Sequence, residues 1–144
     1  MKKFLVFIAA AAIVCLCAQS CKKVLPPAAL PQPVQTFLQT HFAAFTVSYA
    51  TYECCEYDVL LMDGSELEFK KDGEWTNIDM EYAAVPASVL ATLPPAIPAY
   101  LDSCFPGVAV KKIEKGFWYG YKVELMNDLE LIFSSEGEFK RIDD

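Results

Sequence analysis

Histidine is almost absent from this sequence, and the common catalytic motifs are missing. His41 is the only histidine among 144 residues, so catalysis by a nucleophile with a histidine base would have to use it. The sequence holds no His-Glu-x-x-His motif, no glycine-rich phosphate loop and no Cys-x-x-Cys pair. One histidine with scattered cysteines also disfavours zinc. We predict a protein that is not an enzyme, without catalytic residues, metal or cofactor, in which His41 is a structural helix residue.

A disulfide framework is also missing, although the chain has six cysteines. Three of them lie within the first 21 residues, which leaves Cys54, Cys55 and Cys104. An odd number means that at least one thiol stays free or pairs between chains. A bond between the adjacent Cys54 and Cys55 would be strained, and Cys104 with either of them remains open. We interpret the adjacent pair as one residue facing the core and one facing solvent.

Basic residues are outnumbered, with 12 Lys and Arg against 19 Asp and Glu and a net charge of −7. This balance disfavours nucleic acid and anionic membrane surfaces as partners, and it permits a basic protein or a cation. Hydrophobic residues make up 54% of the chain and aromatic residues 13%, which argues against disorder. The sequence therefore predicts a folded domain with its own core.

The N-terminus has the pattern of an export signal. Lys2 and Lys3 precede an apolar run over residues 4–18, and this run is shorter than the ~20 residues that a membrane-spanning helix needs. We predict a signal peptide over residues 1–20. The protein would then be periplasmic or anchored in the cell envelope, and its partner would be an envelope protein.

Cys21 stands directly after the predicted signal. The run Cys17 to Cys21 resembles a bacterial lipoprotein signal, in which the cysteine is acylated, although Ala18 occupies a place where leucine is usual. Simple release into the periplasm is the alternative. The prediction is lipidation at Cys21 as the sole membrane contact, followed by a stiff proline-rich spacer over residues 21–29.

The remaining chain resembles itself at an offset of 63 to 64 residues. Each half carries a Leu-Pro pair, an apolar stripe at helical spacing and then alternating strand patterns separated by Asp-Gly or Glu-Gly turns. The matching segments include Tyr57-Asp58-Val59-Leu60-Leu61 with Tyr121-Lys122-Val123-Glu124-Leu125, Glu66-Leu67 with Glu130-Leu131, and Asp72-Gly73-Glu74 with Glu136-Gly137-Glu138.

This self-similarity predicts an α+β fold of two tandem repeats. Repeat one spans residues 30–80 and repeat two residues 81–144, and together they form one compact, two-layer unit. Each repeat is expected to be a helix followed by a four-stranded antiparallel sheet. The outer face of the sheets is expected to be a solvated charged surface. Its predicted members are Asp58, Glu66, Glu68, Lys122, Glu124 and Glu130. The alternative is that these acids bind a cation, with Glu66, Glu68 and Glu130 as first candidates.

Three consecutive aromatic residues, Phe117, Trp118 and Tyr119, lie between Gly116 and Gly120 in a predicted hairpin. Neighbouring side chains of a strand point to opposite faces, so the three rings cannot all enter one core. We predict that they bind a partner. Packing against the other repeat is the alternative.

The ordered motifs resemble the PepSY-like family of periplasmic proteins with a beta-lactamase-inhibitor-like fold. The resemblance rests on Leu-Pro, Tyr-x-Val-x-Leu, Glu-Leu-Glu-Phe, Asp-Gly-Glu-Trp and Ile-Asp, and it covers about residues 25–144. It implies an α+β repeat fold in the cell envelope, and it supplies no catalytic residues. The oligomeric state stays open.

The functional hypothesis is an exported, non-enzymatic binding module of the envelope that acts as an inhibitor of an envelope enzyme. The alternative is a structural or accessory lipoprotein that scaffolds an envelope complex. Inhibition is an analogy at the level of the fold, and a fold does not fix a function.

Overall fold

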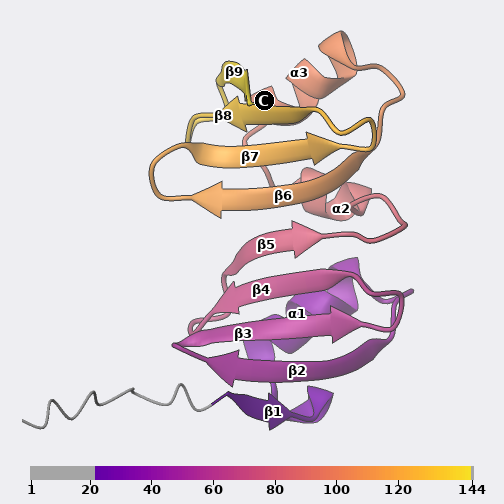
Figure 1. The fold of residues 1–144 in the computed structure, drawn as a ribbon, viewed down its shortest axis with the longest axis vertical. Coiled ribbons are helices and arrows are strands. Elements are labelled where there is room, and N and C mark those ends of the chain that lie inside the picture. The colour runs from indigo at the N-terminus through magenta and orange to yellow at the C-terminus, as the bar shows by residue number, and fades with distance from the viewer. Residues whose placement is uncertain (1–21, 144) are drawn as a thin grey trace, which may run out of the picture.

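Alternating apolar residues build nine β-strands, and the computed structural model, which describes residues 22–143, places all nine in one antiparallel sheet. The strands follow one another in chain order, so each hydrogen-bonds to its neighbours in the sequence (Figure 1). They are β1 (Lys23–Leu25), β2 (Val47–Glu53), β3 (Glu56–Leu61), β4 (Glu66–Lys70), β5 (Trp75–Asp79), β6 (Val110–Gly116), β7 (Gly120–Leu125), β8 (Glu130–Phe133) and β9 (Phe139–Asp143).

The prediction of two tandem repeats, each with a helix and its own four-stranded sheet, is wrong. β5 pairs with β6 through Asn77 opposite Glu114, Ile78 opposite Ile113 and Asp79 opposite Lys112. One continuous sheet therefore runs through the molecule, and the fold is mostly β rather than α+β. Two separate sheets would have left the backbone groups of β5 and β6 unpaired at their edges, and pairing satisfies them. The ninth strand, β1, comes from the segment expected to be a spacer.

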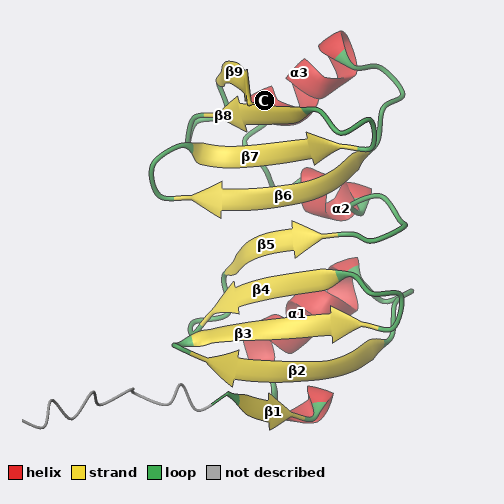
Figure 2. Cartoon of the chain, viewed as in Figure 1, coloured by secondary structure: helices red, strands yellow, loops and turns green. Residues whose placement is uncertain are grey.

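Short helices cover one face of the sheet (Figure 2). They are the 3-10 turn η1 (Pro27–Ala29), α1 (Gln32–His41), α2 (Ala87–Leu90) and α3 (Ala96–Cys104). Proline near the start of α1 costs no intrahelical hydrogen bond, because the first N–H groups of a helix have no partner there. Val34 of α1 and Ile97 of α3 are fully buried against the sheet, so packing rather than length stabilises these helices.

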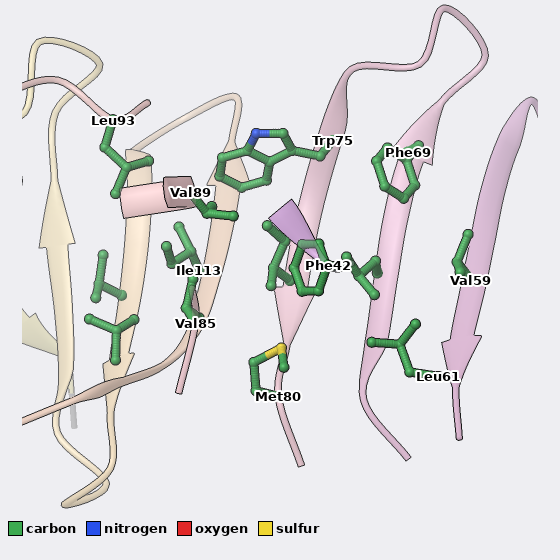
Figure 3. Close-up of a cluster of buried hydrophobic side chains, with 14 of the residues drawn as sticks. Phe42, Val59, Leu61, Phe69, Trp75, Met80, Val85, Val89, Leu93 and Ile113 are labelled. Carbon is green, nitrogen blue, oxygen red and sulfur yellow. The ribbon is translucent and has the colours of Figure 1, made fainter. Parts of the chain in front are cut away.

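One hydrophobic core lies between the helices and the sheet. Alternate strand residues such as Leu67 and Phe69 are 0% exposed. Figure 3 shows Val89 near Ile113 and Trp75, on the two sides of the β5–β6 junction. The core therefore continues across the junction instead of dividing into two.

The opposite face of the sheet carries no helix, and we call it the open face (Figure 2). Asp58 pairs with Glu68 across β3 and β4, and Lys122 lies opposite Glu114 across β7 and β6. Because these residues alternate with buried ones such as Val59 and Val123, their side chains lie on the open face.

The predicted signal peptide at residues 1–20 and the predicted lipidation at Cys21 fall outside the described residues, and they stay predictions. Within residues 22–143, no helix has both the length and the apolar character needed to cross a membrane.

Replacement of Ile113 by Ala tests whether the β5–β6 junction joins the whole protein into one cooperative unit. Ile113 is 0% exposed, and truncation of a buried Ile to Ala costs about 2–5 kcal/mol. We expect Ile113→Ala to lower the free energy of unfolding by this amount, with one coincident urea transition in circular dichroism and tryptophan fluorescence. Two separated transitions would contradict a continuous core.

Candidate functional site

The hairpin between β6 and β7 presents the three aromatic residues in a connection over residues 117–119. Gly116 pairs with Gly120 at its base. Gly120 has φ +94°, and a Cβ there would lie 2.3 Å from the backbone carbon of Ser134. Glycine is therefore required at this position both for the backbone conformation and for the close approach of the turn after β8.

Phe117 and Trp118 project into solvent from this hairpin. Their exposed fractions are 91% and 90%, and their rings meet edge to face with centroids 5.1 Å apart. The alternative that these rings pack against the rest of the sheet does not hold for these two residues. Large rings on a rigid hairpin are the kind of side chain that anchors protein interfaces.

Tyr119 behaves differently from its two neighbours. Its ring lies across Gly116, where a Cβ would come within 2.1 Å of it, and its hydroxyl donates a hydrogen bond to Glu114. Burial and the nearby Glu114 carboxylate raise the pKa of Tyr119 to about 12. A neutral Tyr119 therefore fastens the base of the hairpin to β6, and it leaves Phe117 and Trp118 as the outward pair.

A hollow of about 310 Å³ lies beside the hairpin. Its lining combines Tyr119 and Ile132 with the cations Lys140 and Arg141 of β9. The two cations already pair with acids, Lys140 with Glu138 at 3.0 Å and Arg141 with Asp143 at 3.2 Å. Sequence reasoning missed this hollow, since it depends on the β8–β9 pairing.

Ion pairs cross the open face between β5 and β9. Lys112 Nζ lies 2.9 Å from Asp79, and Lys122 Nζ lies 2.5 Å from Glu130. Lys115 instead lies on the covered face with Ile113, where its Nζ is 3.2 Å from Glu74 and 3.9 Å from the centroid of the buried Trp75 ring. The Lys112 and Lys115 contacts brace β6, and with it the hairpin, against β5 and the turn before it, whereas Lys122 and Glu130 join β7 to β8.

The adjacent cysteines form the β2–β3 turn, and the prediction that one faces the core is wrong. Cys54 and Cys55 have φ +50° and +70°, and both are exposed. Positive φ at two successive residues belongs to a tight hairpin turn, in which side chains do not alternate as they do in a strand. Cys55 and the exposed Cys104 of α3 form no disulfide.

His41 lies at the end of α1, where its Nδ1 is 2.9 Å from Ser88 Oγ of α2. Its ring packs on Phe37 with centroids 4.6 Å apart. Partial burial lowers the pKa of His41. The residue thus connects two helices on the covered face, away from the aromatic hairpin.

Acidic side chains do not converge on a single point. Within residues 22–143, no group of three or more His, Cys, Asp or Glu side chains is placed to hold a metal ion. Glu66 and Glu68 lie on β4, and Glu130 lies on β8, four strands away in the sheet. The three first candidates for a cation site are therefore not brought together.

Comparison with known proteins identifies similar chains. The family model described as "Putative beta-lactamase-inhibitor-like, PepSY-like" matches residues 55–141. A solved "putative periplasmic protein" from Bacteroides vulgatus is 35% identical, with 88% of this chain and 99% of that chain covered and a TM-score of 0.79. A "putative calcium-regulated periplasmic protein" from Bacteroides thetaiotaomicron is 30% identical, with 85% and 97% covered and a TM-score of 0.76. No curated protein matches the chain.

Substitutions in the hairpin should separate the supporting ring from the two exposed ones. Tyr119→Phe removes the hydrogen bond to Glu114, and we expect it to lower the free energy of unfolding by about 0.5–1.5 kcal/mol. Trp118→Ala should change it by less than about 0.5 kcal/mol, because the ring is almost fully exposed. Urea unfolding measures both, and a larger loss for Trp118→Ala would contradict the assignment.

The pH dependence of stability should contain a contribution from His41. Its pKa in the folded protein lies below the 6.5 of an unperturbed histidine, so the unfolded chain binds more protons. This contribution is fully present above pH 6.5 and is lost as pH falls through 6.5 and the lower folded-state value. We expect His41→Gln to flatten the change in unfolding free energy between about pH 7.5 and about pH 5.5. An unchanged slope would show that His41 does not contribute.

Proposed function

This chain belongs to the PepSY-like, beta-lactamase-inhibitor-like family, and from this premise we propose that it is an exported, non-enzymatic binding module of the cell envelope. The similar solved proteins from Bacteroides are named as periplasmic, which supports the location. The family description supports inhibition of an envelope enzyme as the finer function. An acyl chain at Cys21 would be its only membrane attachment.

The observation that carries this proposal is the exposure of Phe117 and Trp118 on a braced hairpin. A soluble protein rarely leaves two adjacent large rings open to water without a use for them. The hairpin is held by Tyr119 and Gly120 before any partner arrives. Binding therefore loses little conformational entropy at the contact.

The size of the hairpin tip limits what it can do alone. One aromatic side chain buries about 150–250 Å², whereas a stable interface buries about 1,200–2,000 Å² in total. A partner that grips Phe117 and Trp118 must also touch other surfaces. The open face is continuous with the hairpin through β6 and β7, and it supplies the remaining area.

A cross-linking pull-down from envelope extract tests the proposal. The baits are the parent chain, Phe117→Ala/Trp118→Ala, and the control Met62→Ala/Tyr82→Ala. The control also removes two exposed side chains, which are 69% and 80% exposed and lie outside the hairpin. We expect a protein that the parent and the control recover and the hairpin variant loses, because the anchors are absent.

The identity of the captured protein then decides between functions. Loss of its catalytic activity on addition of the parent chain, but not of the hairpin variant, supports an inhibitor. An unaffected activity supports the alternative of a structural or accessory lipoprotein. Equal recovery by all three baits would contradict a binding role for the hairpin.

A further inference from the structure

Charge compensation differs sharply between the two halves of the open face. On β5 to β9, carboxylates such as Asp79 and Glu130 have lysine partners at 2.9 and 2.5 Å. On β3 and β4, Asp58, Glu66 and Glu68 form no ion pair with any described residue. We call these three residues the acidic half.

The carboxylates of the acidic half are placed where they repel one another. Asp58 lies directly opposite Glu68 on the neighbouring strand, and like charges in this position destabilise a sheet. Burial raises the pKa of Glu68, and Asp58 and Glu56 add to this effect, while Asn77 and Lys112 act in the opposite direction. The free protein therefore maintains an unfavourable group of charges that an added cation would relieve.

Asn77 provides a second and independent observation at this place. It is 8% exposed, and it lies on the open face opposite Glu68. Its Nδ2 donates to Glu68 Oε1 at 3.3 Å, but its buried Oδ1 has no hydrogen-bond partner. A buried acceptor without a donor is costly. A bound group with several N–H donors would satisfy the amide oxygen as well as the carboxylates.

A hollow of about 180 Å³ opens over the acidic half. Tyr49, Thr51 and Leu60 line it together with the three carboxylates, and Lys22 lies at the same hollow without an ion pair to any of them. A cavity of about 150 Å³ admits a molecule as large as benzene, so this hollow has room for a guanidinium group. Tyr49 is 45% exposed, and it offers a ring face and an apolar surface to a long side chain.

We propose that the acidic half of the open face binds arginine side chains of an extended segment of the partner protein. The proposal rests on the proposed function, because it names the chemistry of the partner. Glu66 and Glu68 are two positions apart on one strand, about 7 Å. An extended segment with basic residues at alternate positions has the same spacing. Arginine fits better than lysine because its planar group can bond Asp58 and Glu68 together.

The acidic half lies close enough to the aromatic hairpin for one partner protein to contact both. Glu68, Asn77 and Glu114 lie in one row across β4, β5 and β6, which places Glu68 about 10 Å from Glu114, and Phe117 follows about 10 Å farther along the chain. One partner can therefore touch Phe117, Trp118 and the acidic half at once. The acidic half would also steer a basic partner toward the sheet before contact, and this attraction weakens as salt is added.

Calorimetric titration of the protein, expressed from its full chain, tests this proposal. The probe is a blocked octapeptide of alternating arginine and glycine, and its control replaces each arginine by the uncharged isostere citrulline. The variant is Asp58→Asn/Glu68→Gln. The control variant is Asp102→Asn/Glu136→Gln, which changes the net charge by the same amount. Both of its residues are exposed and lie outside the acidic half. Glu66→Gln serves as a milder variant if the first does not fold.

We expect the arginine peptide to bind the parent and the control variant Asp102→Asn/Glu136→Gln with equal affinity. Binding to Asp58→Asn/Glu68→Gln should be at least about tenfold weaker, because two charge-assisted contacts are lost. The citrulline peptide should not bind. The midpoint of thermal unfolding of Asp58→Asn/Glu68→Gln should equal or exceed that of the parent, since the substitution removes the repulsion between opposed carboxylates.

Several results would overturn the inference. The first is that the arginine peptide does not bind the parent at low salt. The second is that both double variants lose affinity for the peptide equally. The third is that calcium chloride binds, in a manner that Asp58→Asn/Glu68→Gln abolishes, while the peptide does not bind. Failure of the proposed function is distinguishable. If the envelope pull-down yields a hairpin-dependent partner that Asp58→Asn/Glu68→Gln still captures, this inference fails alone. If the peptide binds as expected and no partner is captured, the proposed function fails.

Discussion

The pairing of β5 with β6 is the constraint on which the rest of the structure depends. Three facing pairs join the strands, and Ile78 and Ile113 are fully buried at the centre of the junction. Lys112 and Lys115 then reach from β6 to Asp79 and Glu74. The junction turns two stretches of sheet into one rigid surface, so the aromatic hairpin and the acidic half keep a fixed separation. A binding surface that is arranged in advance loses less entropy on association.

Local sequence patterns located many elements, but they did not reveal the sheet as a whole. Alternation marked Val59, Leu61, Leu67 and Phe69, which are all buried. The β5–β6 pairing joins residues about 35 positions apart, such as Asn77 and Glu114, and no local period encodes such a contact. The Cys54-Cys55 turn was misread for a related reason, since its positive φ angles depend on how β2 and β3 meet.

The candidate site shows the same division. The sequence located the aromatic cluster because three successive rings cannot share one face. It could not separate their roles, because the inward turn of Tyr119 needs the bare backbone of Gly116 and the carboxylate of Glu114. Asn77 carried no signal in the sequence. Its importance comes from its place opposite Glu68 and from an amide oxygen without a donor.

The two parts of the open face differ in whether their carboxylates are neutralised within the protein: carboxylates such as Asp79 and Glu130 on β5 to β9 form ion pairs, and those of the acidic half do not. The half-exposed ion pairs on β5 to β9 contribute about 1 kcal/mol or less each, but they neutralise their own carboxylates and leave little to attract a partner. The acidic half forgoes even this small gain, with Asp58 opposed to Glu68. A surface that is unfavourable alone and favourable only with a complementary cation discriminates between partners, because a neutral or acidic segment gains nothing there. On this proposal, selectivity for a basic partner comes from three carboxylates that have no ion-pair partner in the free protein.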